Sequence, residues 1–517
     1  LALDGAAEGP LRGPEITACL AGVSDAELPA LLANLGGHDL PELIRVLEKS
    51  EVTPPQPTVI LAYTIKGWGL PVAADPLNHG ALLSPERFAA FRESLGIAEE
   101  ASWAGFSPGS KEHALLSAAA ARVGIGAPPA QPAVTITSAD IPLELNATSA
   151  AMASTQEAFG RALLRLADLP QVGKRVVTVS GDVASSTNLG GWINRVGAFS
   201  LNPGRDYEIG RNTTLRWQPG PGGQHIEFGI AETNVFLALS MLGLSREHNG
   251  QLLFPIGTVY DPFVIRALDA ILYGAYSGAR FIFAGTPSGV TLSPEGGAHQ
   301  ATLTSSLGQE VPLLDFWEPC FAIELEWALL EGLRQCLDRK AGRSTFLRLS
   351  TRPIEQRLIE PALARLGRDG LRAAVLSGGY AIRPARGEGP LVHIVTTGVL
   401  VADALAAAEA LAVEGVDTNI IHLVSPRRAY TTWREGSRTD RHLFDSLIPE
   451  GQRSAPIVTV CDAASHSLAW IGSVYGQRAH PLGVDVYGQS GNRESVYRYV
   501  GIHRDNIIAE ALAAVDD

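Results

Sequence analysis

Short apolar runs that alternate with helical stretches are the feature that most constrains the fold of this 517-residue chain. Each run is four to six residues long and rich in β-branched side chains, as a strand buried on both faces must be. The expected strands lie at 176–180, 280–284, 345–349, 391–396, 418–423 and 457–461. Helical patterns separate them, including an apolar strand and helix around 226–244 and an Ala-rich helix at 402–413. Strands alternating with helices predict an α/β protein with parallel sheets covered on both faces.

The same pattern divides the chain into parts. Residues 1–110 show helical patterns, one expected buried strand at Thr58–Tyr63 and a helix near 84–95, which is too little to close an α/β domain. We expect this part to be the last section of a domain. Complete α/β domains are expected at 151–352 and 389–517, with linkers at 111–150 and 353–388. Ser154 and Glu157 form a capping-box sequence that predicts a helix start at the beginning of the first complete domain.

Charge and cysteine usage exclude several classes of protein. The chain has 41 basic and 54 acidic residues and a formal net charge of −13, which argues against nucleic acid and anionic membrane as partners. No apolar run approaches the roughly 18 residues of a membrane span. The four cysteines are widely separated and lack CxxC spacing, so we expect reduced, buried thiols and a cytoplasmic protein.

The segment 225–234, HIEFGIAETN, reads as a strand that runs into an apolar helix. A helix without a polar face is expected to be buried on all sides, often by a partner subunit. Glu232 then lies in the first turn, where the positive end of the helix dipole tolerates a carboxylate. A structural cap would explain the same residue, and both interpretations stay open at this point.

Three further loops carry chemically active side chains. The Gly- and Ser-rich loop 285–300 follows an expected strand and ends near His299, a candidate proton donor. Asp182 follows the strand at 176–180, at the sheet edge where open α/β proteins bind ligands. Lys66 and His79 share a loop after the expected strand Thr58–Tyr63. Each of these residues, taken singly, also has an ordinary structural explanation as a turn or surface residue.

Together these segments resemble the thiamine diphosphate enzymes of the transketolase superfamily, with the strongest likeness to the homodimeric pyruvate dehydrogenase E1 component. GGHD at 36–39 and PTVILAYTIKGWGL at 57–70 look like the end of its diphosphate-binding domain. The segments STQEAFGRAL, SGDVASSTN, FGIAETN and PEGGAHQ resemble its pyrimidine-binding domain. DVYGQSGNRESVYRYVGI at 485–502 resembles its C-terminal domain. The resemblance implies a parallel-sheet thiamine diphosphate-binding fold with a transketolase-type C-terminal domain.

The resemblance also implies roles for single residues. Glu232 matches the glutamate that contacts the aminopyrimidine ring of the cofactor, and His299 matches a donor to the developing alkoxide. His79 and Lys66 match residues that engage the substrate adduct. Asp182 matches an acidic residue near the cofactor. Tyr260 and Phe263 are candidates for packing on the pyrimidine, although an alternative alignment places the family's aromatic residue at Pro262.

One departure from the family is large. The family binds Mg²⁺ and the diphosphate through a GDG motif, which this chain lacks. Gly181-Asp182-Val183 lies in the wrong domain to replace it. The chain begins with Leu1 rather than Met, so we expect the metal ligands N-terminal to it, with residues 1–110 as the remainder of the diphosphate-binding domain.

These features favour decarboxylation of a 2-oxo acid, pyruvate by default, with acyl transfer to a lipoyl group. The implied partners are a second copy of the chain and a lipoyl-bearing acyltransferase. Transketolase activity is an alternative, because Ser186 and Arg352 resemble phosphate-contacting residues, although Gln156 stands where a phosphate-binding Arg is expected. A truncated, non-enzymatic homologue is the third possibility.

Overall fold

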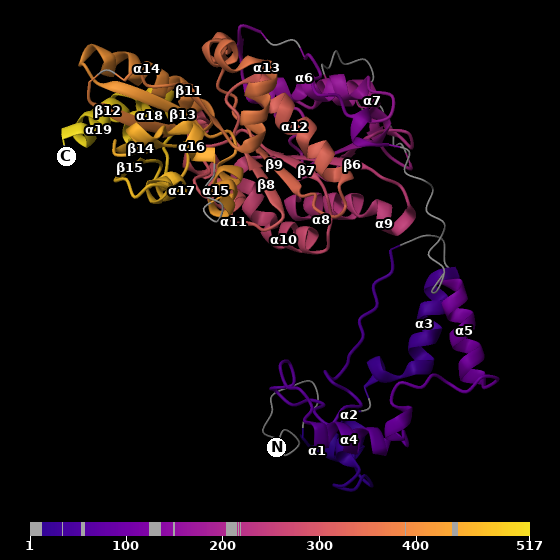
Figure 1. Cartoon of the computed structure of the whole chain (residues 1–517). Helices are drawn as coiled ribbons and strands as arrows, with labels where there is room; N and C mark the ends of the chain where they lie inside the picture. The colour runs from indigo at the N-terminus through magenta and orange to yellow at the C-terminus, as the bar shows by residue number, and fades with distance from the viewer. Residues whose placement is uncertain are drawn as a thin grey trace. The chain divides into compact units, whose positions relative to one another are not determined.

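A computed structural model describes residues 13–516 except 34, 53–56, 124–135, 148–149, 203–214, 216, 218, 388 and 437–442. The chain forms two compact units, residues 1–129 and 130–517 (Figure 1). No described helix is both long and apolar enough to cross a membrane.

The first unit is helical where it is described. Its elements are α1 (Gly13–Cys19), α2 (Leu28–Ala33), η1 (Gly36–His38), α3 (Leu40–Val52), α4 (Pro85–Ser94), η2 (Glu99–Ala101) and α5 (Lys111–Arg122). The predicted helix near 84–95 is present, and its N-cap Ser84 accepts a hydrogen bond from the backbone N–H of Arg87. Helix α5 lies in the stretch 111–150 that was expected to be a linker.

The predicted buried strand Thr58–Tyr63 is not formed. The segment is extended, but it pairs with no strand, and Leu61 is 93% exposed. Its hydrophobic sequence alone does not make a strand, because a strand needs a neighbour to satisfy its backbone hydrogen bonds and no strand lies among the described residues of this unit. The prediction that residues 58–63 form a buried strand is therefore wrong.

The second unit begins with an eight-stranded sheet in which every pairing is parallel, as the sequence predicts. The spatial order is β4-β3-β5-β2-β6-β7-β9-β8. The strands are β2 (Val176–Ser180), β3 (Ala198–Phe199), β4 (Pro219–Gly220), β5 (His225–Glu227), β6 (Phe254–Val259), β7 (Ile282–Gly285), β8 (Leu314–Trp317) and β9 (Ser344–Arg348). Strands β3, β4, β6 and β8 were not among the predicted ones.

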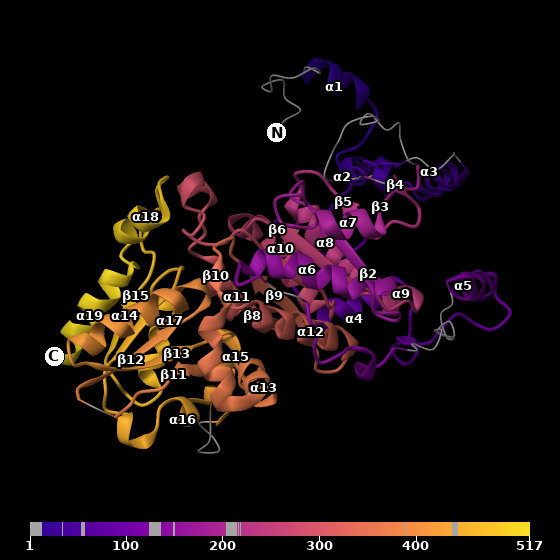
Figure 2. The same cartoon turned by 90° about the horizontal axis from the view of Figure 1, so that it is seen from above.

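Helices cover both faces of this sheet, so the molecule has three layers here (Figures 1 and 2). One layer holds α6 (Thr155–Ala167), α7 (Gly190–Val196) and α12 (Ala322–Leu337); the other holds α8 (Glu232–Gly243), α10 (Leu268–Tyr276) and α11 (Thr304–Glu310). Helix α6 starts with the predicted capping box: Glu157 N–H donates to Ser154 Oγ, and Ser154 N–H donates to Glu157 Oε2. Phe159, Leu163 and Leu166 form its buried face, whereas Leu164, also predicted to be buried, is 36% exposed.

The C-terminal domain is a five-stranded sheet of order β11-β13-β12-β14-β15. Its strands are β11 (Tyr380–Arg383), β12 (Leu391–Thr396), β13 (Asp417–His422), β14 (Ile457–Val460) and β15 (Ala479–Leu482), of which β11 alone is antiparallel. Helices α14 (Val401–Val413), α18 (Arg493–Val500) and α19 (Arg504–Asp516) also belong to this domain.

The stretch 353–388 was expected to be a linker and is instead ordered. It contains α13 (Glu360–Ser377), with a break at Gly367, and strand β11. Leu371 and Val375 of α13 are fully buried in the core that the two domains of this unit share. Burial of these apolar side chains stabilises the segment, which the looser periodicity of the sequence did not indicate.

Candidate functional site

Four neighbouring strands of the large sheet carry the predicted site residues at their C-terminal ends. In the order β5-β2-β6-β7, these ends lead to Glu232, Asp182, Tyr260 with Phe263, and His299. Because all four strands are parallel, their carboxyl ends lie at the same edge, which is where open α/β sheets bind ligands. The structure thus brings together residues that are up to 117 positions apart in the sequence.

Glu232 is the first residue of α8, as predicted, and its residue surface is 8% exposed. Its Oε1 lies 2.8 Å from Nη1 of Arg266, whose side chain is half exposed. The guanidinium of Arg266 in turn lies 3.8 Å above the ring centroid of Phe263. The guanidinium of Arg266 therefore contacts both the carboxylate of Glu232 and the ring of Phe263. The sequence did not single out Arg266.

The aromatic residues and His299 form a cluster beside this pair. The rings of Tyr260 and Phe263 are stacked with centroids 6.0 Å apart. The imidazole of His299 lies edge-on to both, 6.3 Å from Tyr260 and 5.7 Å from Phe263. Glu232, Arg266, Phe263, Tyr260 and His299 are thus linked by consecutive contacts.

Asp182 lies at the same edge but touches none of these side chains. Its backbone is left-handed, with φ of 63°, a conformation that Asp tolerates better than most residues. Its N–H donates to Oε1 of Glu227 at 2.7 Å, and Phe228 N–H donates to the same atom at 3.1 Å. Glu227 therefore ties the turn after β2 to the segment that leads into α8, a role that the HIEFGIAE motif does not reveal by itself.

A buried ion cluster lies beneath the aromatic residues. Arg348, at the end of β9, has a side chain that is 3% exposed; its Nε lies 2.9 Å from Asp261 Oδ2 and its Nη1 lies 2.5 Å from Glu318 Oε1. Burial raises the pKa of Asp261 to about 6, although Arg348 opposes the shift. Asp261 stands between Tyr260 and Phe263, so this cluster anchors the aromatic pair from below. Sequence reasoning did not find it, because its members are far apart in the chain.

The loop that ends at His299 is held by the C-terminal domain. The carboxylate of Asp462 accepts hydrogen bonds from the backbone N–H of Val290 and Thr291 at 2.8 and 3.1 Å and from Thr291 Oγ1 at 2.6 Å. Thr291 Oγ1 also lies 2.6 Å from the hydroxyl of Tyr497. The position of this loop therefore depends on two residues of another domain.

Lys66 and His79 belong to the first unit. The structure brings them together: Nζ of Lys66 lies 2.6 Å from Nδ1 of His79, and both side chains are exposed. Asn78 closes the loop by donating to the carbonyl oxygens of Lys66 and Val72 at 3.0 and 3.1 Å. His38, from the GGHD motif, stacks on a tryptophan of the same loop, Trp68, with centroids 4.6 Å apart.

The donor set at the sheet edge fits the pyrimidine half of the expected cofactor. A buried carboxylate, two aromatic rings and a histidine are the groups that hold and orient a flat, hydrogen-bonding ring. Arg266 covers the Phe263 ring, and its side chain is half exposed. Among the described residues, no group of three His, Cys, Asp or Glu side chains is arranged to hold a metal ion.

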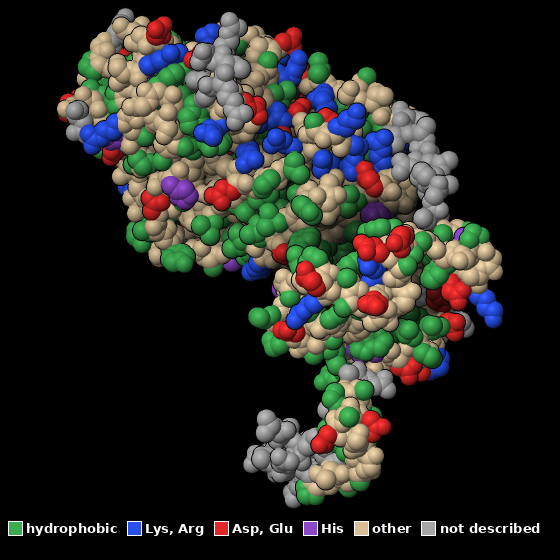
Figure 3. Space-filling model, turned by 60° about the horizontal axis from the view of Figure 1, so that its bottom comes forward, with side chains coloured by type: hydrophobic (Ala, Val, Ile, Leu, Met, Phe, Trp, Pro, Cys, Tyr) green, Lys and Arg blue, Asp and Glu red, His purple; other side chains and the backbone are tan. Residues whose placement is uncertain are grey.

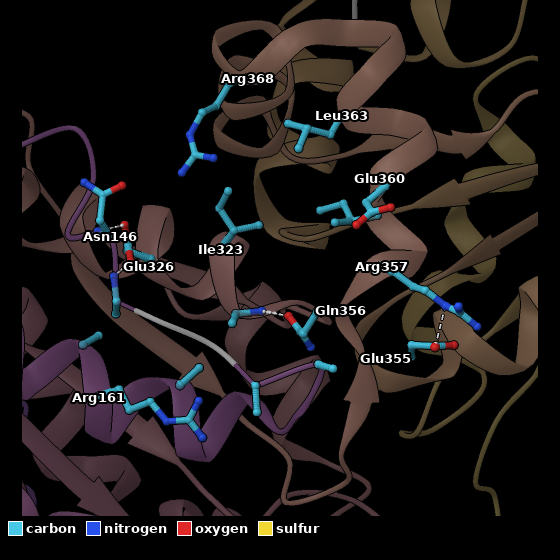
Figure 4. A pocket seen from close by; sticks show the side chains of 17 residues that line it. Asn146, Arg161, Ile323, Glu326, Glu355, Gln356, Arg357, Glu360, Leu363 and Arg368 are labelled. Atoms are coloured by element: carbon cyan, nitrogen blue, oxygen red, sulfur yellow. Dashed lines mark hydrogen bonds and ion pairs between the residues drawn. The ribbon is translucent and has the colours of Figure 1, made fainter.

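A cavity of about 420 Å³ lies in the same unit away from these residues, between α6, α12 and α13 (Figure 4). Figure 4 shows Arg161 and Arg368 at opposite sides of it, with Ile323 between them. Glu326 accepts hydrogen bonds from the backbone N–H of Leu145, Asn146 and Ala147. None of the predicted site residues lines this cavity.

Comparison with known proteins agrees with this architecture. Residues 151–351 match the family described as the transketolase pyrimidine-binding domain, and residues 378–503 match the transketolase-like C-terminal domain. The two matches together cover more than half of the chain. It belongs to the transketolase-like enzyme family.

Relatives of this transketolase-like chain carry two names. The pyruvate dehydrogenase E1 component of Pseudomonas aeruginosa is 24% identical over 98% of the chain and 59% of its own length. The chromosomal transketolase of Cupriavidus necator is 25% identical over 94% of the chain and 68% of its own length. The crystal structure of transketolase from Campylobacter jejuni has the same fold, with a TM-score of 0.64 at 17% identity, and the match covers 96% of the chain and 70% of that structure. The chain thus spans about 60% of the E1 relatives that it matches.

Three residues bear on whether the chain is more similar to the E1 relatives or to the transketolases. Gln156 Nε2 donates to the carbonyl of Ser186 at 2.9 Å, and Gln156 Oε1 accepts from Thr286 at 2.6 Å. Arg352 is paired with Asp403 at 2.5 Å, and its side chain is 11% exposed. In this transketolase-like chain, the side chains of Gln156 and Arg352 therefore already bind partners within the chain.

The predicted reduced state of the cysteines agrees with the structure, in which all four are free. Cys320, Cys336 and Cys461 are buried, and burial raises the pKa of Cys336 to about 12. Cys19 is exposed, contrary to expectation, as are the other α1 side chains that the structure describes.

Proposed function

We propose that this protein takes part in thiamine diphosphate-dependent decarboxylation of a 2-oxo acid, pyruvate by default, and passes the acyl unit to a lipoyl group. The convergence of Glu232, Phe263, Tyr260 and His299 at one sheet edge is the observation that carries the proposal. Thiamine diphosphate would supply, when bound, a nucleophilic carbon for the oxo carbon of the substrate and a cationic ring that serves as an electron sink in decarboxylation.

The chain's own residues position and exchange protons in this proposal. Glu232, at the buried start of α8, orients the aminopyrimidine ring by a hydrogen bond, while Tyr260 and Phe263 pack on it. His299 donates a hydrogen bond to the oxygen that gains charge as the oxo carbon is attacked. Lys66 donates to Nδ1 of His79 at 2.6 Å, and its ammonium is suited to a substrate carboxylate. Asp182 is assigned to the cofactor side of the same edge. Mg²⁺ accompanies the diphosphate, and no described residue is assigned to it.

Ketol transfer between sugar phosphates is the second candidate, since some relatives are named transketolase. The internal hydrogen bonds of Gln156 and the ion pair of Arg352 favour the 2-oxo acid instead, because these groups are not free to receive a sugar phosphate. We place both candidates above a non-enzymatic role because the predicted side chains converge.

A second copy of the chain is the proposed partner at α8 and α10. Helix α8 was expected to be buried on all sides, but Leu237 is 50% and Met241 58% exposed. Tyr273 and Tyr276 of α10 are exposed beside it, at 67% and 86%. Figure 3 shows hydrophobic side chains gathered on this side of the second unit. A lipoyl-bearing acyltransferase remains the proposed acyl acceptor.

The proposal is tested with purified protein, thiamine diphosphate and Mg²⁺ in two assays. One supplies pyruvate with a lipoyl acceptor, and the other supplies a ketose phosphate with an aldose phosphate. We expect turnover in the first assay and a loss of at least about 100-fold for Glu232→Gln. Glu414→Gln, at an exposed position after α14, is the matched control and should keep full activity.

Turnover in the second assay alone would replace the proposal by ketol transfer. Activity of Glu232→Gln within about tenfold of wild type would refute the role of this carboxylate. Thiamine diphosphate binding, followed by quenching of tryptophan fluorescence, separates a lost ligand site from a lost chemical step.

A further inference from the structure

A second cavity, of about 320 Å³, lies in the C-terminal domain. Its walls come from the first turns of α14, from α18 and from the beginning of α19. Helices α14 and α19 pack against each other, and Figures 1 and 2 both show α18 beside them. None of the residues proposed above for catalysis lines this cavity.

The lining is rich in guanidinium groups. Arg493 and Arg498 of α18 and Arg504 of α19 are exposed, and Arg352 closes the wall toward the large sheet. Only two acidic side chains, Asp403 and Glu494, belong to the lining, so the formal charge of the cavity is two units positive with histidine neutral.

The pairing of these charges leaves capacity for an anion. Asp403 is occupied by Arg352 at 2.5 Å, and Glu494 lies 3.7 Å from Arg498. Asp505, behind the lining, lies 3.8 Å from Arg498 and 3.5 Å from Arg504. Arg493 has no ion-pair partner among the residues that the structure describes. Each of the contacts at 3.5 Å or more is longer than a charge-assisted hydrogen bond, so these guanidinium groups keep unused donors.

His503 supplies an independent observation. Its side chain is 10% exposed, and it lines the cavity. Its Nδ1 lies 3.2 Å from the backbone N of Asp505 and 3.2 Å from Oδ2 of the same residue. No hydrogen bond of Nε2 is found in the described part of the chain, so this nitrogen of a nine-tenths buried side chain is left for a ligand.

We propose that this cavity binds a phosphate-bearing anion. Guanidinium forks match phosphate oxygens, and a phosphate monoester at neutral pH carries about two negative charges, which equals the excess charge of the lining. The cavity also lies at the first turns of α14 and α19, where the positive ends of the helix dipoles favour an anion. Arg493, Arg498 and Arg504 hold the phosphate, and His503 Nε2–H donates to one of its oxygens.

Calorimetric titration of the intact protein without thiamine diphosphate tests this site. The probes are inorganic phosphate and, separately, glycerol 3-phosphate, at low ionic strength. We expect one saturable site for at least one probe and an affinity at least about tenfold weaker in the double variant Arg493→Ala/Arg504→Ala. Both positions are exposed, so the double variant should fold, which its far-ultraviolet circular dichroism verifies. Arg165→Ala, at an exposed position on α6, is the matched control and should bind like wild type.

The outcomes separate this proposal from the catalytic one. Equal binding of both probes means that the phosphate group alone is recognised, and tighter binding of the monoester means that the cavity also holds its organic part. Binding should be unchanged in Glu232→Gln, since that residue lies outside the cavity. The proposal is overturned if neither probe shows saturable binding, or if the double variant binds them as tightly as wild type.

Discussion

Replacing Arg348 by Met is expected to destabilise the protein more than any single surface change. The guanidinium is 97% buried and pairs with two carboxylates, Asp261 and Glu318, whose side chains are 0% and 4% exposed. It also donates to the carbonyl oxygens of Ala301 and Asp462 at 3.1 and 2.9 Å. Removing one partner of a buried ion pair costs about 3–5 kcal/mol, because the remaining charge stays buried without compensation. Here two carboxylates lose their cation, so we expect the upper end of that range.

The loss of stability in Arg348→Met should depend on pH in a defined direction. Burial raises the pKa of Asp261 to about 6. The native state therefore binds a proton at this carboxylate more tightly than the unfolded chain does. The stability that the protonated group contributes at low pH is lost as the pH rises through about 6. Without the positive charge of Arg348, the ionised carboxylate of Asp261 is even less favourable in the native state. Arg348→Met should therefore cost more free energy of unfolding at about pH 8 than at about pH 5.

Urea unfolding followed by tryptophan fluorescence measures this difference. Arg165→Met is the exposed control and should change the free energy of unfolding by less than about 0.5 kcal/mol. The triple variant Arg348→Met/Asp261→Asn/Glu318→Gln should recover part of the loss, because it removes the uncompensated charges. A loss below about 1 kcal/mol for Arg348→Met, or a loss that does not change with pH, would refute the assignment of a buried ion cluster.

Three further changes follow from the described contacts. Ser154→Ala removes the oxygen that caps α6 and should lower the free energy of unfolding by about 1 kcal/mol in urea titrations; no change would show that the cap is dispensable. Asp462→Asn weakens the acceptor of Val290 and Thr291 and should lower kcat of the proposed reaction more than it raises KM, while the reverse split would contradict a role in positioning the His299 loop. Met241→Lys places a charge on the exposed face of α8 and should shift sedimentation from dimer to monomer without loss of stability; an unchanged dimer would move the proposed interface elsewhere.

The sequence predicts the two sheets of the second unit well for a physical reason. Strands buried on both faces, such as β2 and β12, have mostly apolar sequences, and their ends coincide with the predicted ones. The placement of Glu232, Asp182 and His299 after parallel strands was also predictable, because a parallel sheet places all carboxyl ends at one edge. Strand β6 was missed, as its sequence FPIGTV contains Pro255 and Gly257, which weaken a strand signal.

The contacts that join these residues were not predictable from local patterns. Arg348 meets Asp261 and Glu318 only when the ends of β6, β8 and β9 have been brought to one edge of the sheet, and a lone arginine in a strand gives no sign of its partner. The exposed run Thr58–Tyr63 is the opposite case: its apolar pattern is clear, but the described residues of its unit offer no strand to pair with. A hydrophobic pattern indicates that a segment is suited to burial, but it does not identify the element that would pack against it.

The loop that carries His299 shows why the C-terminal domain matters to the proposed chemistry. Its early backbone is fixed by Asp462, and Gly289 is required there, since a Cβ would lie 2.3 Å from Asp462 Oδ2 and the backbone φ is +65°. Tyr497, which also lines the cavity of about 320 Å³, contacts the same loop through its hydroxyl at Thr291. A C-terminal domain that served only as a spacer would have no need of these buried polar contacts. The catalytic histidine of the proposal therefore depends on a domain that supplies none of the residues expected to touch the pyrimidine ring.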